Sequence, residues 1–328
     1  MMKNGLRRFA SILLFAGLAA QLAAAQEAPA PHYRAFDSKG QAVTLQAIVD
    51  SLEGADVLFV GETHDNAVAH LLEAEMLRRT DERFGAASGR GRAVALSLEM
   101  FERDVQTVLD EYLAGLISER HFLLSSRPWK NYETDYRPLV EYARAHRLPV
   151  IAANAPARYV SRVSSQGPAS LGALSKDVIK SWLPPLPFPP ASEGYAAKFN
   201  RFMTGGAPAA PTPTPTPAAT PAVAQTVQAN PHGSMHLLEA QTLRDASMAY
   251  RIADFLKRGR DPLVVQVNGT FHSEERMGVP EQLARYRPKT RAVVVTIVSD
   301  EGFPAFDAAR LGRLGDFIII TDPAAVRR

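Results

Sequence analysis

Cysteine is absent from the 328 residues of this chain. Its absence excludes disulfide bonds, thiolate metal sites, covalent c-type haem attachment and lipid attachment to an N-terminal cysteine. Any metal ion would depend on imidazole nitrogen and carboxylate oxygen instead.

The N-terminal hydrophobic run, about residues 9–20, is too short to cross a bilayer comfortably. It follows a basic start with Lys3, Arg7 and Arg8 and precedes the small residues that end at Ala25. This order is typical of a secretory signal peptide with an A-x-A cleavage site. We therefore expect residues 1–25 to be a signal peptide and the mature protein, 26–328, to be periplasmic or secreted. An uncleaved N-terminal anchor is the alternative.

A surplus of charge is also missing once this segment is set aside. The whole chain has 37 basic and 34 acidic side chains, and residues 1–25 contribute three basic and no acidic ones, which leaves 34 of each. A mature protein without net formal charge gives no electrostatic reason to expect nucleic acid as a partner.

Short apolar runs alternate with longer amphipathic segments over most of the chain. Six runs have the length and composition of buried strands: residues 57–60, 93–98, 149–153, 263–267, 292–298 and 317–320. Helical periodicity marks segments between them: residues 67–79, 104–113, 138–146, 237–257 and 280–286. This alternation predicts an α/β fold, in which a mostly parallel central sheet carries helices on both faces.

Residues 205–231 depart from this composition, because they contain no aromatic and no charged side chain and consist largely of Pro, Thr and Ala. Such a segment cannot bury enough apolar area to offset the entropy lost on ordering. We expect a disordered insertion within a single domain, since the strands on both sides are needed for one sheet. A boundary between two domains is the alternative.

Polar side chains follow four of the predicted strands, at the point where each strand ends. The carboxyl ends of parallel strands meet at one edge of a sheet, where open α/β sheets bind ligands. We therefore expect a shared site formed by five of these side chains: Glu62, His64, Glu99, Asn154 and His272. Asp65 and Asn66 are better explained as caps of the following helix.

Two histidines with one or two carboxylates suit a first-row divalent ion such as Zn, Mn or Fe, with room for a water ligand. That water can attack an ester or peptide carbonyl, with a second carboxylate as base. The predicted metal ligands are Glu62, His64, Glu99 and His272, and Glu62 and Glu99 are the predicted catalytic residues if the protein is a hydrolase. The alternative is that each side chain is structural, as a lone strand-end glutamate or histidine often is.

Several stretches, taken together, resemble the ChaN family of haem-binding proteins: FVGETHDN, LSLEMF, WKNYETDYRPLVEYARAHRLPVIAANAP, LEAQTLRDASMAYRIADFL and VNGTFHSEERMGVP. That family belongs to the Tiki superfamily, which includes metal-dependent proteases, is similar to erythromycin esterases, and is marked by two G-x-x-H motifs and an acidic residue. Here these fall on residues 61–64, residues 269–272 and Glu99. The resemblance implies a haem-binding protein of the cell envelope that works with haem or iron-uptake components.

Haem needs an axial ligand, which in this chain must be His, Tyr or Met. Tyr132 and Tyr136 lie four residues apart beside Trp129, and His232 and His236 lie four apart at the start of a helix. Each pair offers ligands on one helical face. The alternatives are amphipathic packing for the tyrosines and a solvated helix start for the histidines.

Arg244 is a candidate partner for a haem propionate or another acidic group at the same edge of the sheet. An ordinary ion pair on a helix surface is the alternative. His70 is expected to make a second-sphere contact to the site, and a homodimer is a further possibility for the assembly.

Overall fold

The computed structural model describes residues 30–205, 236–259 and 261–326. The predicted signal peptide and all but the first residue of the predicted insertion lie outside these ranges. The described residues share one eight-stranded sheet, in the order β2-β1-β8-β7-β3-β6-β4-β5. Its strands are β1 (Tyr33–Asp37), β2 (Ala42–Val43), β3 (Val57–Glu62), β4 (Ala93–Glu102), β5 (Val150–Asn154), β6 (Pro262–Gly269), β7 (Ala292–Ser299) and β8 (Phe317–Thr321).

The six strands predicted from apolar runs are confirmed, and they pair in parallel from β8 to β5. Strand β3 lies in the middle between β7 and β6, and all six of its residues are buried. The sequence analysis missed β1 and β2, which pair antiparallel at the β8 edge. Strand β1 buries only one of its five residues fully, so it lacks the apolar run that identifies the central strands.

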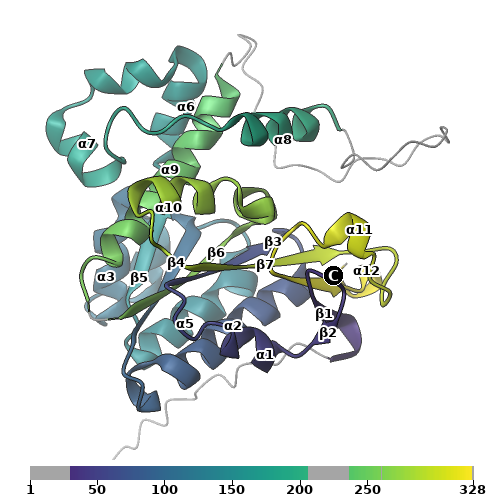
Figure 1. Ribbon diagram of the computed structural model, residues 1–328. Coiled ribbons are helices and arrows are strands. Elements are labelled where there is room, and N and C mark those ends of the chain that lie inside the picture. Colours follow the sequence, from purple (N-terminus) through teal and green to yellow (C-terminus); the bar gives the residue numbers. More distant parts are fainter. Residues whose placement is uncertain (1–29, 206–235, 260, 327–328) are drawn as a thin grey trace, which may run out of the picture.

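Helices cover both faces of the sheet, as predicted (Figure 1). The main ones are α1 (Leu45–Asp50), α2 (Ala67–Phe84), α3 (Gln106–Leu113), α4 (Glu119–Ser126), α5 (Arg137–His146), α6 (Ala157–Gln166), α7 (Lys176–Trp182), α8 (Glu193–Met203), α9 (Leu237–Phe255) and α10 (Val279–Tyr286). Side chains of α1, α2 and α5 pack on one face of the sheet and those of α9 and α10 on the other. Helices α6 and α7 pack against the far side of α9 and form an additional layer.

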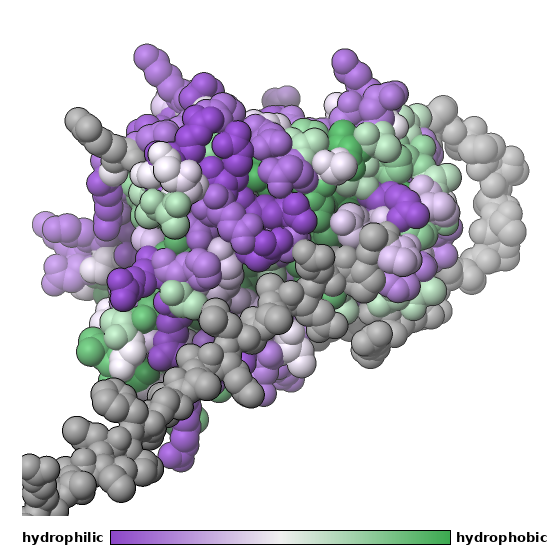
Figure 2. Space-filling view, turned by 90° about the horizontal axis from the view of Figure 1, so that it is seen from below, coloured by the Kyte–Doolittle hydropathy of each residue, from purple (hydrophilic) through white to green (hydrophobic). Residues whose placement is uncertain are grey.

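The outer side of the α1, α2 and α5 layer is mostly hydrophilic, with smaller hydrophobic areas (Figure 2). None of the helices in the described ranges is long and apolar enough to span a bilayer. Short helices α11 (Ala308–Leu311) and α12 (Pro323–Val326) flank β8.

Candidate functional site

The carboxyl ends of β3, β6, β4 and β5 are neighbours in the sheet, so the side chains that follow them converge. In the registers of the paired strands, Glu62 lies beside Gly269 and Glu102 beside Asn154. The structure brings together all five side chains that the sequence placed at this edge, and the contacts described below connect them: Glu62, His64, Glu99, Asn154 and His272.

The two G-x-x-H motifs interlock through their glycines. A Cβ atom on Gly269, in the second motif, would lie 2.9 Å from Cε1 and Nε2 of His64 in the first. A Cβ atom on Gly61, in the first motif, would lie 2.8 Å from Oγ of Ser273 and 3.2 Å from Cα of Thr270. Each glycine therefore makes room for the other motif, which explains why glycine is needed at both positions.

Glu62 and His64 form a hydrogen-bonded pair at the end of β3. Nδ1–H of His64 donates to Oε1 of Glu62 at 2.5 Å, and the hydroxyl of Tyr136 donates to the same oxygen at 3.1 Å. Burial alone would lower the pKa of His64, but the hydrogen bond to Glu62 and its charge outweigh burial and raise this pKa. Because Nδ1 is occupied, the lone pair of the neutral ring is on Nε2.

The imidazole of His64 is the accessible part of this pair. Its side chain is 35% exposed, whereas that of Glu62 is fully buried. The ring of Trp129 stands edge-on to it, with 4.7 Å between the ring centroids. Asn131 donates from Nδ2 to the backbone carbonyl of His64 at 3.2 Å and so fixes the loop.

His272 lies between two carboxylates. Its Nδ1 is 2.6 Å from Oδ1 of Asp245, and its Nε2 is 3.2 Å from Oε1 of Glu99. Burial alone would lower the pKa of His272, but Glu99 and Asp245 outweigh burial and raise this pKa to about 10. Tyr195 donates its hydroxyl to the other oxygen of Asp245, which completes a buried chain of four side chains.

Glu99 is held as an anion by its surroundings. Burial would raise the pKa of Glu99, but the charge of His272 and the backbone N–H of Gly269, which donates to Oε2 at 2.8 Å, hold this pKa well below its usual range. Asn154 donates from Nδ2 to the backbone carbonyl of Glu99 at 3.0 Å. Arg244 reaches the same edge, as predicted, and donates to Oδ1 of Asn154 at 3.4 Å.

Three residues of this site were missed by the sequence analysis: Tyr195, Lys198 and Gln241, whose Nε2 lies 3.1 Å from Nε2 of His272. Asp245 was expected at the same edge beside Arg244, but without a role. Asp245 had a visible signal, because it is an acidic residue within the apolar stretch of α9, where it is fully buried. Tyr195 and Lys198 lie on α8, whose sequence gives no sign of contact with the sheet. The ammonium of Lys198 is buried and donates to the backbone carbonyls of Phe271 and Glu274 at 2.8 and 3.1 Å, which holds the segment that carries His272.

The side chains predicted as haem ligands do not share one environment, because the tyrosines are buried and His236 is partly exposed. Tyr132 and Tyr136, in a single π-helical turn, are 1% and 0% exposed, so neither phenol reaches the surface. His236 is partly exposed at the start of α9 and lies against Gly167, while His232 is outside the described residues.

The role proposed for Asn66 as a helix cap is confirmed. Its side-chain oxygen accepts from the backbone N–H groups of Val68 and Ala69 at 3.1 and 3.0 Å, at the start of α2. Its amide group donates to the hydroxyl of Thr321 at 2.9 Å and so connects this loop to β8.

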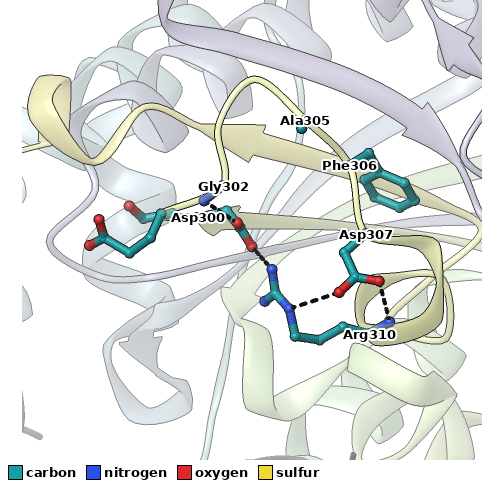
Figure 3. A pocket seen from close by; sticks show the side chains of 8 residues that line it. Asp300, Gly302, Ala305, Phe306, Asp307 and Arg310 are labelled. Carbon is teal, nitrogen blue, oxygen red and sulfur yellow. Dashed lines mark hydrogen bonds and ion pairs between the residues drawn. The ribbon is translucent and has the colours of Figure 1, made fainter.

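A surface hollow of about 480 Å³ lies at the end of β7 (Figure 3). Arg310 forms ion pairs with Asp300 and Asp307 there, and Asp300 also accepts from the backbone N–H of Gly302, while Glu301 lines the hollow as well. Because Arg310, the basic side chain of this lining, is already paired, the candidate site remains the sheet edge with the two G-x-x-H motifs.

Comparison with known proteins assigns the part of the chain that contains this site to a family. Residues 48–283, more than half of the chain, match the family described as "Haem-binding uptake, Tiki superfamily, ChaN". The chain belongs to this family. The match includes both G-x-x-H motifs and Glu99, so the resemblance drawn from the sequence stretches is confirmed.

Solved structures with the same fold include ChaN of Campylobacter jejuni, described with cofacial haem binding. It has a TM-score of 0.58 and 15% identity, over 90% of this ChaN-family chain and 99% of that chain. An erythromycin esterase, EreC, in an open conformation has a TM-score of 0.48 and 11% identity, over 89% of this chain and 99% of that one. Among curated proteins, the chloroplastic protein RETICULATA-RELATED 5 of Arabidopsis thaliana is 25% identical over 269 residues. These are 77% of this chain but 32% of that protein, so the chain spans about a third of the length of this relative.

Proposed function

We propose that the protein binds haem in the cell envelope and takes part in haem or iron handling. The observation that carries this proposal is its membership of a haem-binding family over residues 48–283. The leader-like sequence of residues 1–25 supports a periplasmic or secreted location.

The residues at the sheet edge fit a haem group by their chemistry. Iron needs a ligand atom with an accessible lone pair, and Nε2 of His64 meets this requirement because Glu62 occupies Nδ1. Haem also needs apolar surface, which Trp129 provides beside His64. We therefore place the iron at His64, with Arg244 available for a propionate.

Phe271 adds aromatic surface next to His272. Phe202 lies against it with 5.1 Å between ring centroids, and the side chain of Phe202 is 58% exposed. Met203, the next residue, is 52% exposed, and exposed apolar side chains that lie together are typical of surfaces that contact a partner or ligand. They therefore support an apolar ligand at this end of the molecule.

Haem titration of the purified, haem-free mature chain tests the proposal. We expect a shifted Soret band that saturates at a fixed stoichiometry and is lost in His64→Ala. His146→Ala is the matched control, because His146 is a surface histidine with 41% exposure on α5. No change in the Soret spectrum of the wild type would refute the haem proposal.

The same titration decides between His64 and the ligands predicted from sequence. If a tyrosine is the ligand, Tyr132→Phe or Tyr136→Phe removes the Soret shift while His64→Ala retains it. If only His232→Ala or His236→Ala loses the Soret shift, the axial ligand belongs to that histidine pair instead. Mass measurement in solution, with and without haem, tests the homodimer considered in the sequence analysis.

A metal-dependent hydrolase is the second candidate, and the carboxylate-backed imidazole of His64 favours it. A carboxylate that orients an imidazole leaves the other ring nitrogen ready to act as a base or as a metal ligand. A divalent ion held by His64 and Glu99 would supply Lewis-acid chemistry at the sheet edge. Turnover of ester or peptide substrates that chelators inhibit, and that His64→Ala and Glu99→Gln abolish, would establish it. Turnover that both variants retain would exclude this site.

A further inference from the structure

A second group of ionisable side chains lies behind the site, between β3 and α2. It consists of Glu62, His70 and Glu73, which are 1%, 4% and 0% exposed. One ligand atom from each lies within 4.8 Å of the other two. His70 and Glu73 are three residues apart on the buried side of α2, so the helix presents both to the end of β3.

The polar atoms of this group lack hydrogen-bond partners within the described part of the chain. They are Oε2 of Glu62, both ring nitrogens of His70 and both carboxylate oxygens of Glu73. Within the group, Nδ1 of His70 lies 3.5 Å from Oε2 of Glu73, which is too long for a hydrogen bond. Buried carboxylate oxygens without partners are costly, and buried charges normally pair or coordinate a metal.

We propose that Glu62, His70 and Glu73 hold a divalent first-row transition metal ion. Bonds of 2.0–2.2 Å to nitrogen and oxygen place neighbouring tetrahedral ligands about 3.4 Å apart. The observed 3.5 Å between His70 and Glu73 matches that spacing. One imidazole and two carboxylates suit Zn, Mn or Fe, and two buried negative charges balance a dication.

His70 is surrounded as metal-binding histidines usually are, with a carboxylate next to its second ring nitrogen. Its second ring nitrogen, Nε2, is 3.4 Å from Oδ2 of Asp135, and Asn131 donates to that oxygen at 2.8 Å. A carboxylate beside the far nitrogen fixes the tautomer and directs the lone pair of Nδ1 toward the ion. The ring of Tyr136 stands edge-on to His70 and limits its rotation.

This site differs from the metal site predicted from the sequence. It shares Glu62 but uses His70 and Glu73 in place of His64, Glu99 and His272. The two oxygens of Glu62 serve different partners, since Oε1 accepts from His64 and Tyr136 while Oε2 is free to bind the ion. The alternative without a metal is a buried ion pair between His70 and Glu73. Burial alone would lower the pKa of His70, but Glu73 and the neighbouring carboxylates outweigh burial and raise this pKa to about 9.

Metal analysis of the haem-free, full mature chain tests the proposal. The chain is stripped with EDTA, reloaded separately with Zn²⁺, Mn²⁺ and Fe²⁺, desalted and measured for metal and for thermal unfolding. We expect about one ion per chain and a higher unfolding temperature in the loaded protein, because binding to the native state alone stabilises it. We expect Asp135→Asn to lower metal affinity about 10–100-fold, as removal of a second-sphere partner does.

Glu73→Gln is the decisive variant. This substitution removes a metal ligand, but it also removes a buried negative charge, and we therefore expect the variant to fold. It should not bind the ion, and its unfolding temperature should no longer depend on added metal. Glu82→Gln is the matched control, because Glu82 lies on the same helix and is 54% exposed. It should retain the ion, and so should Glu99→Gln.

Two results would overturn the proposal. The first is a wild-type chain that retains none of the three ions and whose unfolding temperature is unchanged by them. The second is an ion that Glu99→Gln removes and Glu73→Gln retains, which would assign the metal to the sheet edge. Because the protein is haem-free, neither result depends on haem binding.

Discussion

The interlocking of the two G-x-x-H motifs predicts different effects for an alanine at each glycine. Alanine carries no backbone penalty at Gly269, where φ is −57° and ψ is 143°. The effect there comes from the added Cβ atom, which would lie 2.9 Å from the His64 ring, against 3.4–4 Å for ordinary contact. His64 is partly exposed and can swing away, so Gly269→Ala should cost little stability but break the hydrogen bond between His64 and Glu62.

Gly61→Ala should act in the opposite way. Its Cβ atom would meet Ser273, which is fully buried and accepts from Nδ2 of Asn268 at 3.0 Å, and the backbone of Thr270. Neither neighbour can move into solvent, so the cost is that of overpacking a core, about 1–3 kcal/mol. At about 2 kcal/mol, a chain of this size should lose about 3 °C in Tm.

Two measurements distinguish these effects. Circular dichroism gives the unfolding temperatures, and NMR titration gives the pKa of His64. In Gly269→Ala this pKa should move from its raised value back toward 6.5, because the contribution of Glu62 is lost. The reasoning is refuted if Gly269→Ala lowers Tm more than Gly61→Ala and leaves the pKa of His64 unchanged.

Three further predictions follow from single contacts. Tyr195→Phe should cost about 1–3 kcal/mol in urea unfolding, because buried Asp245 loses its hydroxyl donor. Tyr250→Phe, whose hydroxyl makes no hydrogen bond to the residues that the structure describes, should be near neutral. Asn66→Ala should cost about 1–2 kcal/mol through loss of the α2 cap, whereas Asn66→Ser, which also lacks the amide that reaches Thr321 but keeps a capping oxygen, should cost less; equal losses would contradict the capping role. Burial lowers the pKa of Lys198 below 10.5, so the unfolded chain binds more protons between the two values and stability should rise with pH there. Lys198→Met should abolish that rise, and an unchanged pH profile in this variant would exclude the contribution.

Much of the sheet could be predicted because its central strands are buried on both faces. Strands such as β3 and β6 then read as continuous apolar runs, and the polar residues after them stand out. The parallel arrangement brought Glu62, Glu99, Asn154 and His272 to one edge without any knowledge of packing. Helices α6 to α8 were missed, and α7 and α8 lie on either side of the proline-rich stretch 184–190, which argued against regular structure there although Ser175 and Ser192 cap these two helices.

The remaining site residues lie on helices, and this explains why the sequence did not reveal them. Which side of a helix meets the sheet end depends on its rotation and crossing angle, and neither is encoded in local periodicity. Asp245 and Lys198 reach the site only because α9 and α8 pack as they do. His70 was noticed, but its spacing to Glu73 has meaning only once α2 is placed over β3.

Glu62 connects the exposed and the buried parts of the site. One oxygen orients His64, which is the most accessible nitrogen ligand at the sheet edge, and the other lies with His70 and Glu73. An ion bound behind β3 would keep Glu62 ionised and fixed, and so would hold the imidazole in the tautomer that leaves Nε2 free. The haem and hydrolase proposals both need that nitrogen. Metal in the buried group would therefore act on either function by positioning His64, without contact between the ion and the ligand or substrate.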